Sequence, residues 1–196
     1  TLGAVANNGY DISVQGNGNL TLGGIVSGAG GLTLDTTFTG TNTLSGANTF
    51  TGGLTIKSGT AVANISNSST ISGAAGPSAY PITLGDALGG NASLLANSFT
   101  VSNAVNLGLN AVGTLTLGNN GAAYAAIFTG PINLNGTNLL VATTGTTGGT
   151  TLSGGITNSG NLLLSNGGSG ASTITLSLNP VNHVGAITAL DGTGTG

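Results

Sequence analysis

The chain contains no cysteine, methionine, tryptophan, glutamate or arginine, and charged residues make up only 3% of its 196 residues. Without cysteine it can form neither a disulfide nor a thiolate metal site, and this absence fits a secreted bacterial protein. Lys57 is the single basic residue besides one histidine, so the basic clusters needed for contact with nucleic acid or an anionic membrane surface are excluded. Side chains that could carry out catalysis are therefore scarce.

Long apolar segments are missing as well. The longest apolar run, Ala122–Phe128, has seven residues, whereas a membrane-spanning helix needs roughly 18–20. We therefore expect no membrane insertion of this chain. There is no initiator methionine and no signal peptide at Thr1, which indicates a processed form or a fragment.

Small residues dominate what is present, because Gly, Thr, Asn and Ser together exceed half of the chain. Such a composition approaches that of low-complexity segments. Disorder is disfavoured, however, because about a quarter of the residues are Leu, Ile, Val or Phe and the formal net charge is only −3. We expect a folded chain.

The apolar residues alternate with small polar ones, which predicts short half-buried strands. Threonine between aliphatic residues favours this structure because it is β-branched. Turns are predicted at clusters of Gly and Asn, which tolerate a positive φ, such as Asn7–Gly9, Gly28–Gly31, Asn119–Gly121 and Asn166–Gly168. The alternating segments are Leu20–Leu22, Leu32–Leu34, Leu54–Ile56, Ile82–Leu84, Phe99–Val101, Leu115–Leu117, Ile132–Leu134 and Ile174–Leu178.

Helices are nearly excluded, because an exposed amphipathic helix needs more charged residues than the chain has. The segment Asp86–Phe99 could hold one helical turn around Leu94 and Leu95, but Gly89-Gly90 interrupts it. A globular β-sandwich is an alternative, but aromatic residues make up only 4% of the chain. A β-solenoid with about 20–25 residues per turn fits better. It would have roughly eight or nine turns and a length of about 40 Å, with Asn and Thr stacked in ladders along it.

Two segments carry a family resemblance. In the segment 28–60, Leu32-Thr33, Thr43–Gly46, Ala47–Gly53 and Thr55–Thr60 follow one another as L-T, T-L-S-G, A-N-T-F-T-G-G and T-I-K-S-G-T. This order resembles the autotransporter-associated β-strand repeat, and the segment 150–177 looks like a weaker copy. The resemblance implies an all-β, right-handed parallel β-helix (β-solenoid), here as a single domain over 1–196, and a secreted or surface-exposed passenger region.

The carboxylates are Asp11, Asp35, Asp86 and Asp191. Stacking of turns could bring Asp11 near Asp35, but hydrolases and lyases need several acids with a base in one cleft. We interpret these residues as turn or cap residues and expect neither a catalytic site nor an enzyme.

No cofactor or metal site is expected from the remaining motifs. His183 follows a probable turn and has no G-x-S-x-G partner motif, so we interpret it as an exposed or hydrogen-bonded turn residue. Gly167–Gly170 lacks the Asp of a calcium repeat, and no G-x-G-x-x-G is present. Ice-binding solenoids align Thr-x-Thr pairs once per turn. The pairs that begin at Thr37, Thr49, Thr114 and Thr173 are spaced too unevenly to show a regular rank.

Self-association remains as the leading hypothesis. A low net charge gives little repulsion between copies, and a solenoid leaves unpaired strand edges at both ends. We therefore expect a non-catalytic structural protein, extracellular or at the bacterial cell surface, that joins copies of itself by strand addition or coil stacking into a filament, sheath or surface layer. The alternatives are a stalk or adhesive autotransporter passenger that binds cell-surface glycans, and an ice-binding solenoid.

Overall fold

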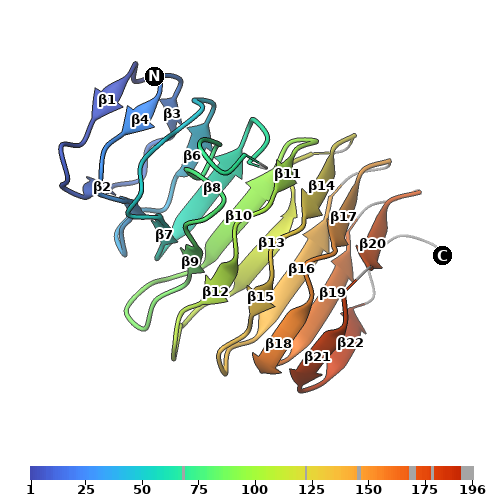
Figure 1. Cartoon of the computed structure of the whole chain (residues 1–196). Helices are drawn as coiled ribbons and strands as arrows, with labels where there is room; N and C mark the ends of the chain where they lie inside the picture. The colour runs from blue at the N-terminus through green and yellow to red at the C-terminus, as the bar shows by residue number, and fades with distance from the viewer. Residues whose placement is uncertain (68, 122, 145–146, 168–170, 178, 191–196) are drawn as a thin grey trace.

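The chain folds as a β-solenoid of about seven turns in the computed structural model, which describes residues 1–67, 69–121, 123–144, 147–167, 171–177 and 179–190 (Figure 1). Across these ranges there is no helix, and every pairing between strands is parallel. A helix long and apolar enough to cross a membrane is accordingly absent from the described part of the chain. The expected all-β solenoid is confirmed.

Two eight-stranded sheets run the length of the solenoid. Sheet 1 consists, in spatial order, of β3 (Leu20–Leu22), β6 (Thr41–Leu44), β8 (Gly59–Ala63), β10 (Ala92–Ala96), β13 (Leu115–Asn119), β16 (Leu139–Thr143), β19 (Leu162–Asn166) and β22 (Ile187–Leu190). Sheet 2 consists of β2 (Ile12–Val14), β5 (Leu32–Leu34), β7 (Leu54–Ile56), β9 (Ile82–Leu84), β12 (Val105–Leu107), β15 (Ile132–Asn133), β18 (Ile156–Ser159) and β21 (Val181–Val184).

The third side of the solenoid is less continuous. It begins with the pair β1 (Val5–Ala6) and β4 (Val26–Ser27). It ends with a four-stranded sheet, sheet 3, made of β11 (Thr100–Val101), β14 (Ala125–Phe128), β17 (Gly149–Leu152) and β20 (Thr173–Leu176). In Figure 1, the blue strands β1–β3 lie at one end of the column and β20–β22 at the other.

The core is a set of columns in which each inward-facing side chain stacks on its partner in the next turn. In sheet 2, one column is aliphatic in all eight strands: Ile12, Leu32, Leu54, Ile82, Val105, Ile132, Ile156 and Val181. Its interior members from Leu32 to Ile156 are at most 1% exposed. The middle residue of each three-residue strand faces outward, which is the pattern that the L-T-L motif predicts.

Buried asparagine side chains form hydrogen bonds with the backbone at several corners of the solenoid. Asn48 is fully buried; its Oδ1 accepts the Val26 N–H at 2.8 Å and its Nδ2 donates to the Ala74 carbonyl at 2.7 Å. The Asn119 amide likewise bonds the backbone of Gly121, Tyr124 and Thr144. These amides satisfy backbone groups where the chain leaves a sheet. The expected stacking between side-chain amides occurs only in short pieces, such as Asn97 to Asn64 at 2.9 Å.

The turns vary in length, because paired positions lie between 19 residues apart (Thr41 and Thr60) and 33 residues apart (Gly59 and Ala92). The extra residues are held in corner loops, so the structure has about seven turns where we expected eight or nine. The helical turn that the segment around Leu94 and Leu95 could hold does not form, and both residues lie in the strand β10. Leu94 stacks between Ala61 and Leu117, and this stacking selects the extended backbone.

Candidate functional site

The carboxylates do not converge. The Asp11 carboxylate accepts the Gly31 N–H at 2.7 Å, and the Asp86 carboxylate accepts the Leu88 N–H at 2.8 Å. Asp11 precedes β2 and Asp35 follows β5, so the two lie at opposite ends of a strand pair, contrary to the proximity considered from the sequence. Asp191 lies outside the described residues. Among the residues that are described, no group of three His, Cys, Asp or Glu side chains could hold a metal ion.

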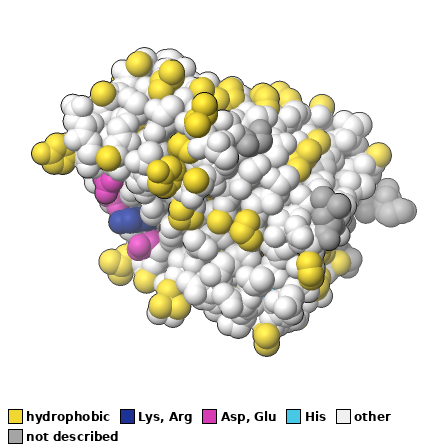
Figure 2. Space-filling model, viewed as in Figure 1, with side chains coloured by type: hydrophobic (Ala, Val, Ile, Leu, Met, Phe, Trp, Pro, Cys, Tyr) yellow, Lys and Arg dark blue, Asp and Glu magenta, His cyan; other side chains and the backbone are white. Residues whose placement is uncertain are grey.

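Asp35 is the centre of a small polar network on one corner. Its carboxylate accepts the Thr36 N–H at 2.7 Å, the Gln15 Nε2–H at 3.0 Å and the Ser13 hydroxyl at 3.1 Å, and it lies 3.7 Å from the Lys57 ammonium. The backbone donor first, then Gln15 and Ser13, lower the pKa of Asp35 from 3.8 to about 2. Figure 2 shows blue and magenta side chains together at one edge of the molecule, on a surface that is mostly uncharged. These hydrogen bonds and the ion pair link three neighbouring turns at this corner, which is a structural role.

His183 is not in a turn, as we had expected, but in the strand β21. Both of its ring nitrogens are buried and have no hydrogen-bond partner in the described structure. In the register of sheet 2, His183 pairs with Asn158. No nucleophile or carboxylate in the described structure forms a hydrogen bond with His183. We therefore interpret it as a structural residue of the last described turn.

A regular polar rank runs along the outer face of sheet 2, although the sequence spacing showed none. The rank takes one residue from each of the eight strands: Ser13, Thr33, Thr55, Thr83, Asn106, Asn133, Thr157 and Asn182. By contrast, the Thr pairs singled out in the sequence lie on different sides, since Thr116 of the pair that begins at Thr114 is in sheet 1 and Thr173 and Thr175 are in sheet 3. The turns differ in length, so the residues of the rank do not recur at a fixed spacing in the sequence.

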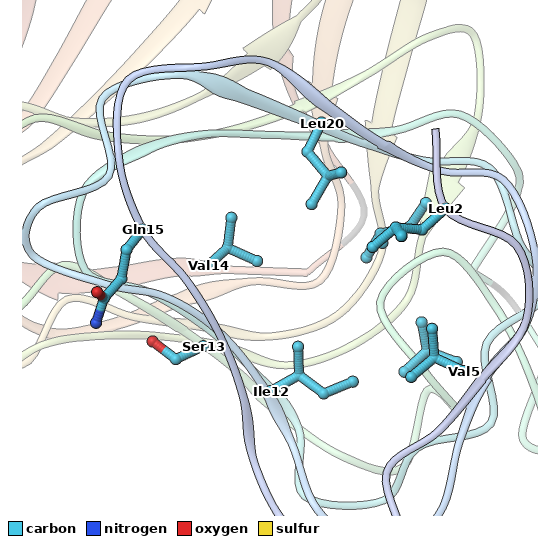
Figure 3. Close-up of a pocket in the computed structure, with 9 residues that line it drawn as sticks. Leu2, Val5, Ile12, Ser13, Val14, Gln15 and Leu20 are labelled. Atoms are coloured by element: carbon cyan, nitrogen blue, oxygen red, sulfur yellow. The ribbon is translucent and has the colours of Figure 1, made fainter.

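An apolar hollow lies at the N-terminal end of the solenoid, with a volume of about 310 Å³. Figure 3 shows Leu2, Val5, Ile12, Val14 and Leu20 around it, pointing toward a common centre, while Gln15 points away. Leu22 and Val26 complete the apolar lining. The hollow is the solenoid core seen end-on, at the point where the stacking of described turns begins.

The chemistry of this hollow favours packing over small-molecule binding. Its volume is near the lower limit of about 300 Å³ for ligand sites, and such sites place a few polar groups that orient a ligand. Here the inward-pointing side chains are all aliphatic, and the polar lining residues Ser13 and Gln15 are bonded to Asp35. An apolar layer of the same cross-section would fill it.

The opposite end of the solenoid also presents incomplete layers. The last strands, β21 and β22, form the outer edges of sheets 2 and 1. Ile187 occupies an inward-facing position above the buried Leu162, yet it is 51% exposed. Val184 and Leu190, at outward-facing positions of the same two strands, are exposed as well. None of these residues was singled out in the sequence, because their role follows from being in the last described turn and not from a motif.

Comparison of the chain with protein-family models, with curated proteins and with solved structures found no match. The resemblance to the autotransporter-associated β-strand repeat thus stays a prediction from the segments 28–60 and 150–177.

Proposed function

We propose that this protein is a non-catalytic structural protein, located outside the cell or at its surface, whose copies join end to end into a filament, sheath or surface layer. The observation that supports this proposal is the apolar hollow of about 310 Å³ at the N-terminal end, beside the outer edge of β2, which pairs with no other described strand. An aliphatic layer exposed to water favours burial by about 25 cal/mol per Å² of apolar surface removed. A formal net charge of −3 offers little repulsion against such contact.

Sedimentation and electron microscopy test this function directly. The purified 196-residue chain should form linear polymers whose average length rises with protein concentration. Their width should equal that of one solenoid, because the junctions lie on the solenoid axis. A monodisperse monomer across the micromolar to millimolar range would count against the proposal.

A second candidate, binding to an ordered surface such as ice, draws on the rank of Ser, Thr and Asn on the outer face of sheet 2. Small hydroxyl and amide groups recur there at the strand spacing of about 4.8 Å. The test is thermal hysteresis of the soluble protein. Thr83→Tyr in the rank should abolish the activity, whereas Thr116→Tyr on the outer face of sheet 1 should retain it. A wild-type protein without thermal hysteresis would remove this candidate.

The third candidate is adhesion, for which the described residues form no site as distinct as the hollow or the rank. Cell-surface glycans could contact the Thr and Asn faces, but such a role rests on the family resemblance and on composition. A glycan array with the 196-residue chain separates this alternative from the structural one, because a polymer-forming protein needs no bound glycan.

A further inference from the structure

We propose that copies of this chain join head to tail, with the last turn of one copy seated on the N-terminal hollow of the next, in a single defined register. This inference rests on the proposed end-to-end association and names its partner surfaces. The junction would place Val181 of one copy against Ile12 of the next copy and Ala189 against Leu20.

Strand polarity favours the head-to-tail arrangement. Sheet 1 runs from β3 at one edge to β22 at the other, and sheet 2 runs from β2 to β21. In the described structure β2, β21 and β22 each have one free edge, and the outer edge of β3 is paired only near its end, where Leu2 lies beside Leu22. Placing β21 and β22 beside the next copy's β2 and β3 continues both sheets in parallel, as in every strand pair among the described residues. Two identical ends facing each other would instead have to form antiparallel pairs, which occur between no two strands of the described structure.

The interval between the two sheets is compatible with this register. Ile12 and Val181 belong to one inward-facing column of sheet 2, and Leu20 and Ala189 belong to one inward-facing column of sheet 1. Eight residues separate Ile12 from Leu20, and eight separate Val181 from Ala189. In the turns between, the same interval ranges from 7 residues (Leu54 to Ala61) to 12 (Val105 to Leu117). The first and last turns thus share one corner length, and both sheets can pair in a single seating.

Apolar burial accompanies this pairing. The hollow exposes Ile12, Val14 and Leu20 partially, whereas the equivalent positions one turn further on sheet 2, Leu32 and Leu34, are fully buried. The same contrast holds at the other end, where Ile187 is 51% exposed above the fully buried Leu162. Stacking a turn on each end would convert these partially exposed layers into interior ones. Contacts of this kind are heterologous and do not close, so they extend into a filament.

Crosslinking tests the register, and the absence of cysteine from the chain makes single-cysteine variants specific. The proposed seating places Asn182 beside Ser13 of the next copy, both on the outer face of sheet 2. Neighbouring strands lie about 4.8 Å apart, within the Cα separations that a disulfide spans. Ser13→Cys and Asn182→Cys should each stay uncrosslinked alone, and an oxidised mixture should give a covalent dimer containing one copy of each. Thr83→Cys, in the middle of the same face, is the matched control and should crosslink with neither.

The outcomes separate the two proposals. A wild-type chain that stays monomeric in sedimentation overturns the proposed function and this inference together. Wild-type polymers with dimers of Ser13→Cys alone, or of Asn182→Cys alone, overturn only the head-to-tail arrangement. Efficient crosslinking of Thr83→Cys would show that copies meet through their faces and would also overturn it.

Blocking variants provide a second readout that does not depend on cysteine chemistry. Leu20→Asp places a charge in the hollow, and Ile187→Asp places one on the last turn. Each variant alone should be monomeric, since each lacks one of the two surfaces of a junction. Mixed in equal amounts they should form dimers that do not grow, because the remaining intact surfaces complement each other once. Circular dichroism of each variant at the wild-type value confirms that the fold is retained, and a folded mixture without dimers would overturn the proposal.

Discussion

Asn42 lies directly beside Leu20 in an inward-facing column of sheet 1, with Ala61 on its other side. Its side chain is fully buried, and neither its Oδ1 nor its Nδ2 has a hydrogen-bond partner in the described structure. A buried amide without partners costs about 1–3 kcal/mol. Asn42 is therefore a weak point of the core one turn below the hollow.

Replacing this amide should stabilise the protein. We expect Asn42→Leu to raise the free energy of unfolding by about 1–3 kcal/mol, because it removes two unsatisfied polar atoms and adds apolar contact. Since the melting temperature of a chain of this size changes by about 2–4 °C per kcal/mol, differential scanning calorimetry resolves the change. Asn48→Leu is the matched control: its amide bonds Val26 and Ala74, so the same substitution should lower the melting temperature. Equal effects at both positions would contradict this account.

Asp35 should make stability depend on pH only in acid. Its pKa is lowered from 3.8 to about 2 in the folded protein, so the unfolded chain binds a proton at a higher pH than the folded one. The stability that Asp35 contributes is fully present above about pH 4 and is lost as the pH falls toward 2. Urea denaturation between pH 7 and pH 2 measures this loss.

The control for the acid effect is a change of a second carboxylate that accepts a backbone hydrogen bond. Asp35→Asn should be less stable than wild type at pH 7 and should lose less stability on acidification. Asp86→Asn, at a carboxylate that accepts a backbone N–H from Leu88, should keep the acid-dependent part contributed by Asp35. A wild-type curve that stays flat down to pH 2 would show that the bonds around Asp35 are not maintained in solution.

Close backbone stacking at one corner should make Gly154 intolerant of a side chain. A Cβ at Gly154 would lie 1.9 Å from the Gly130 carbonyl oxygen, whereas a Cβ at Gly18 has no atom within 4 Å. Gly154→Ala should therefore lower the free energy of unfolding by about 1–3 kcal/mol through overpacking. Gly18→Ala should leave it within about 0.5 kcal/mol of wild type. Chemical denaturation of the two variants side by side checks this difference.

Hydrogen exchange should be slowest in the middle of the solenoid. The strand β12 pairs on both sides, with β9 and β15, whereas β2 and β22 each pair on one side only. In the monomer, amides of β12 should therefore be protected longest and those of the edge strands least. Uniform protection along the chain at low concentration would contradict this gradient.

Much of sheet 2 could be predicted from the sequence, because several of its strands place one small polar residue between buried aliphatic ones, as in Leu32-Thr33-Leu34. Sheet 1 was harder. Its outer face carries apolar residues such as Val62 and Leu95, so the alternation disappears and Leu94-Leu95 suggested a helical turn. The stacking of neighbouring turns, which no local pattern encodes, decides the structure there.

The candidate site could not be predicted, for a related reason. Ile12 and Val14 have the same pattern as their buried equivalents Leu32 and Leu34, and only their place in the first described turn leaves them partly open. The rank on sheet 2 was hidden because paired residues are 20 to 28 positions apart, so a search at a fixed period misses it. Register along the solenoid axis is the information that the sequence alone did not provide.

The unequal length of the turns has a consequence for engineering. The corner between β9 and β10 extends outward and carries Leu88 at 84% exposure, while the strands on either side keep their register with the neighbouring turns. Foreign peptides grafted at such a corner would be accommodated without shifting the rungs. If copies also join head to tail, each copy would carry one graft, and the grafts would be spaced evenly along the fibre.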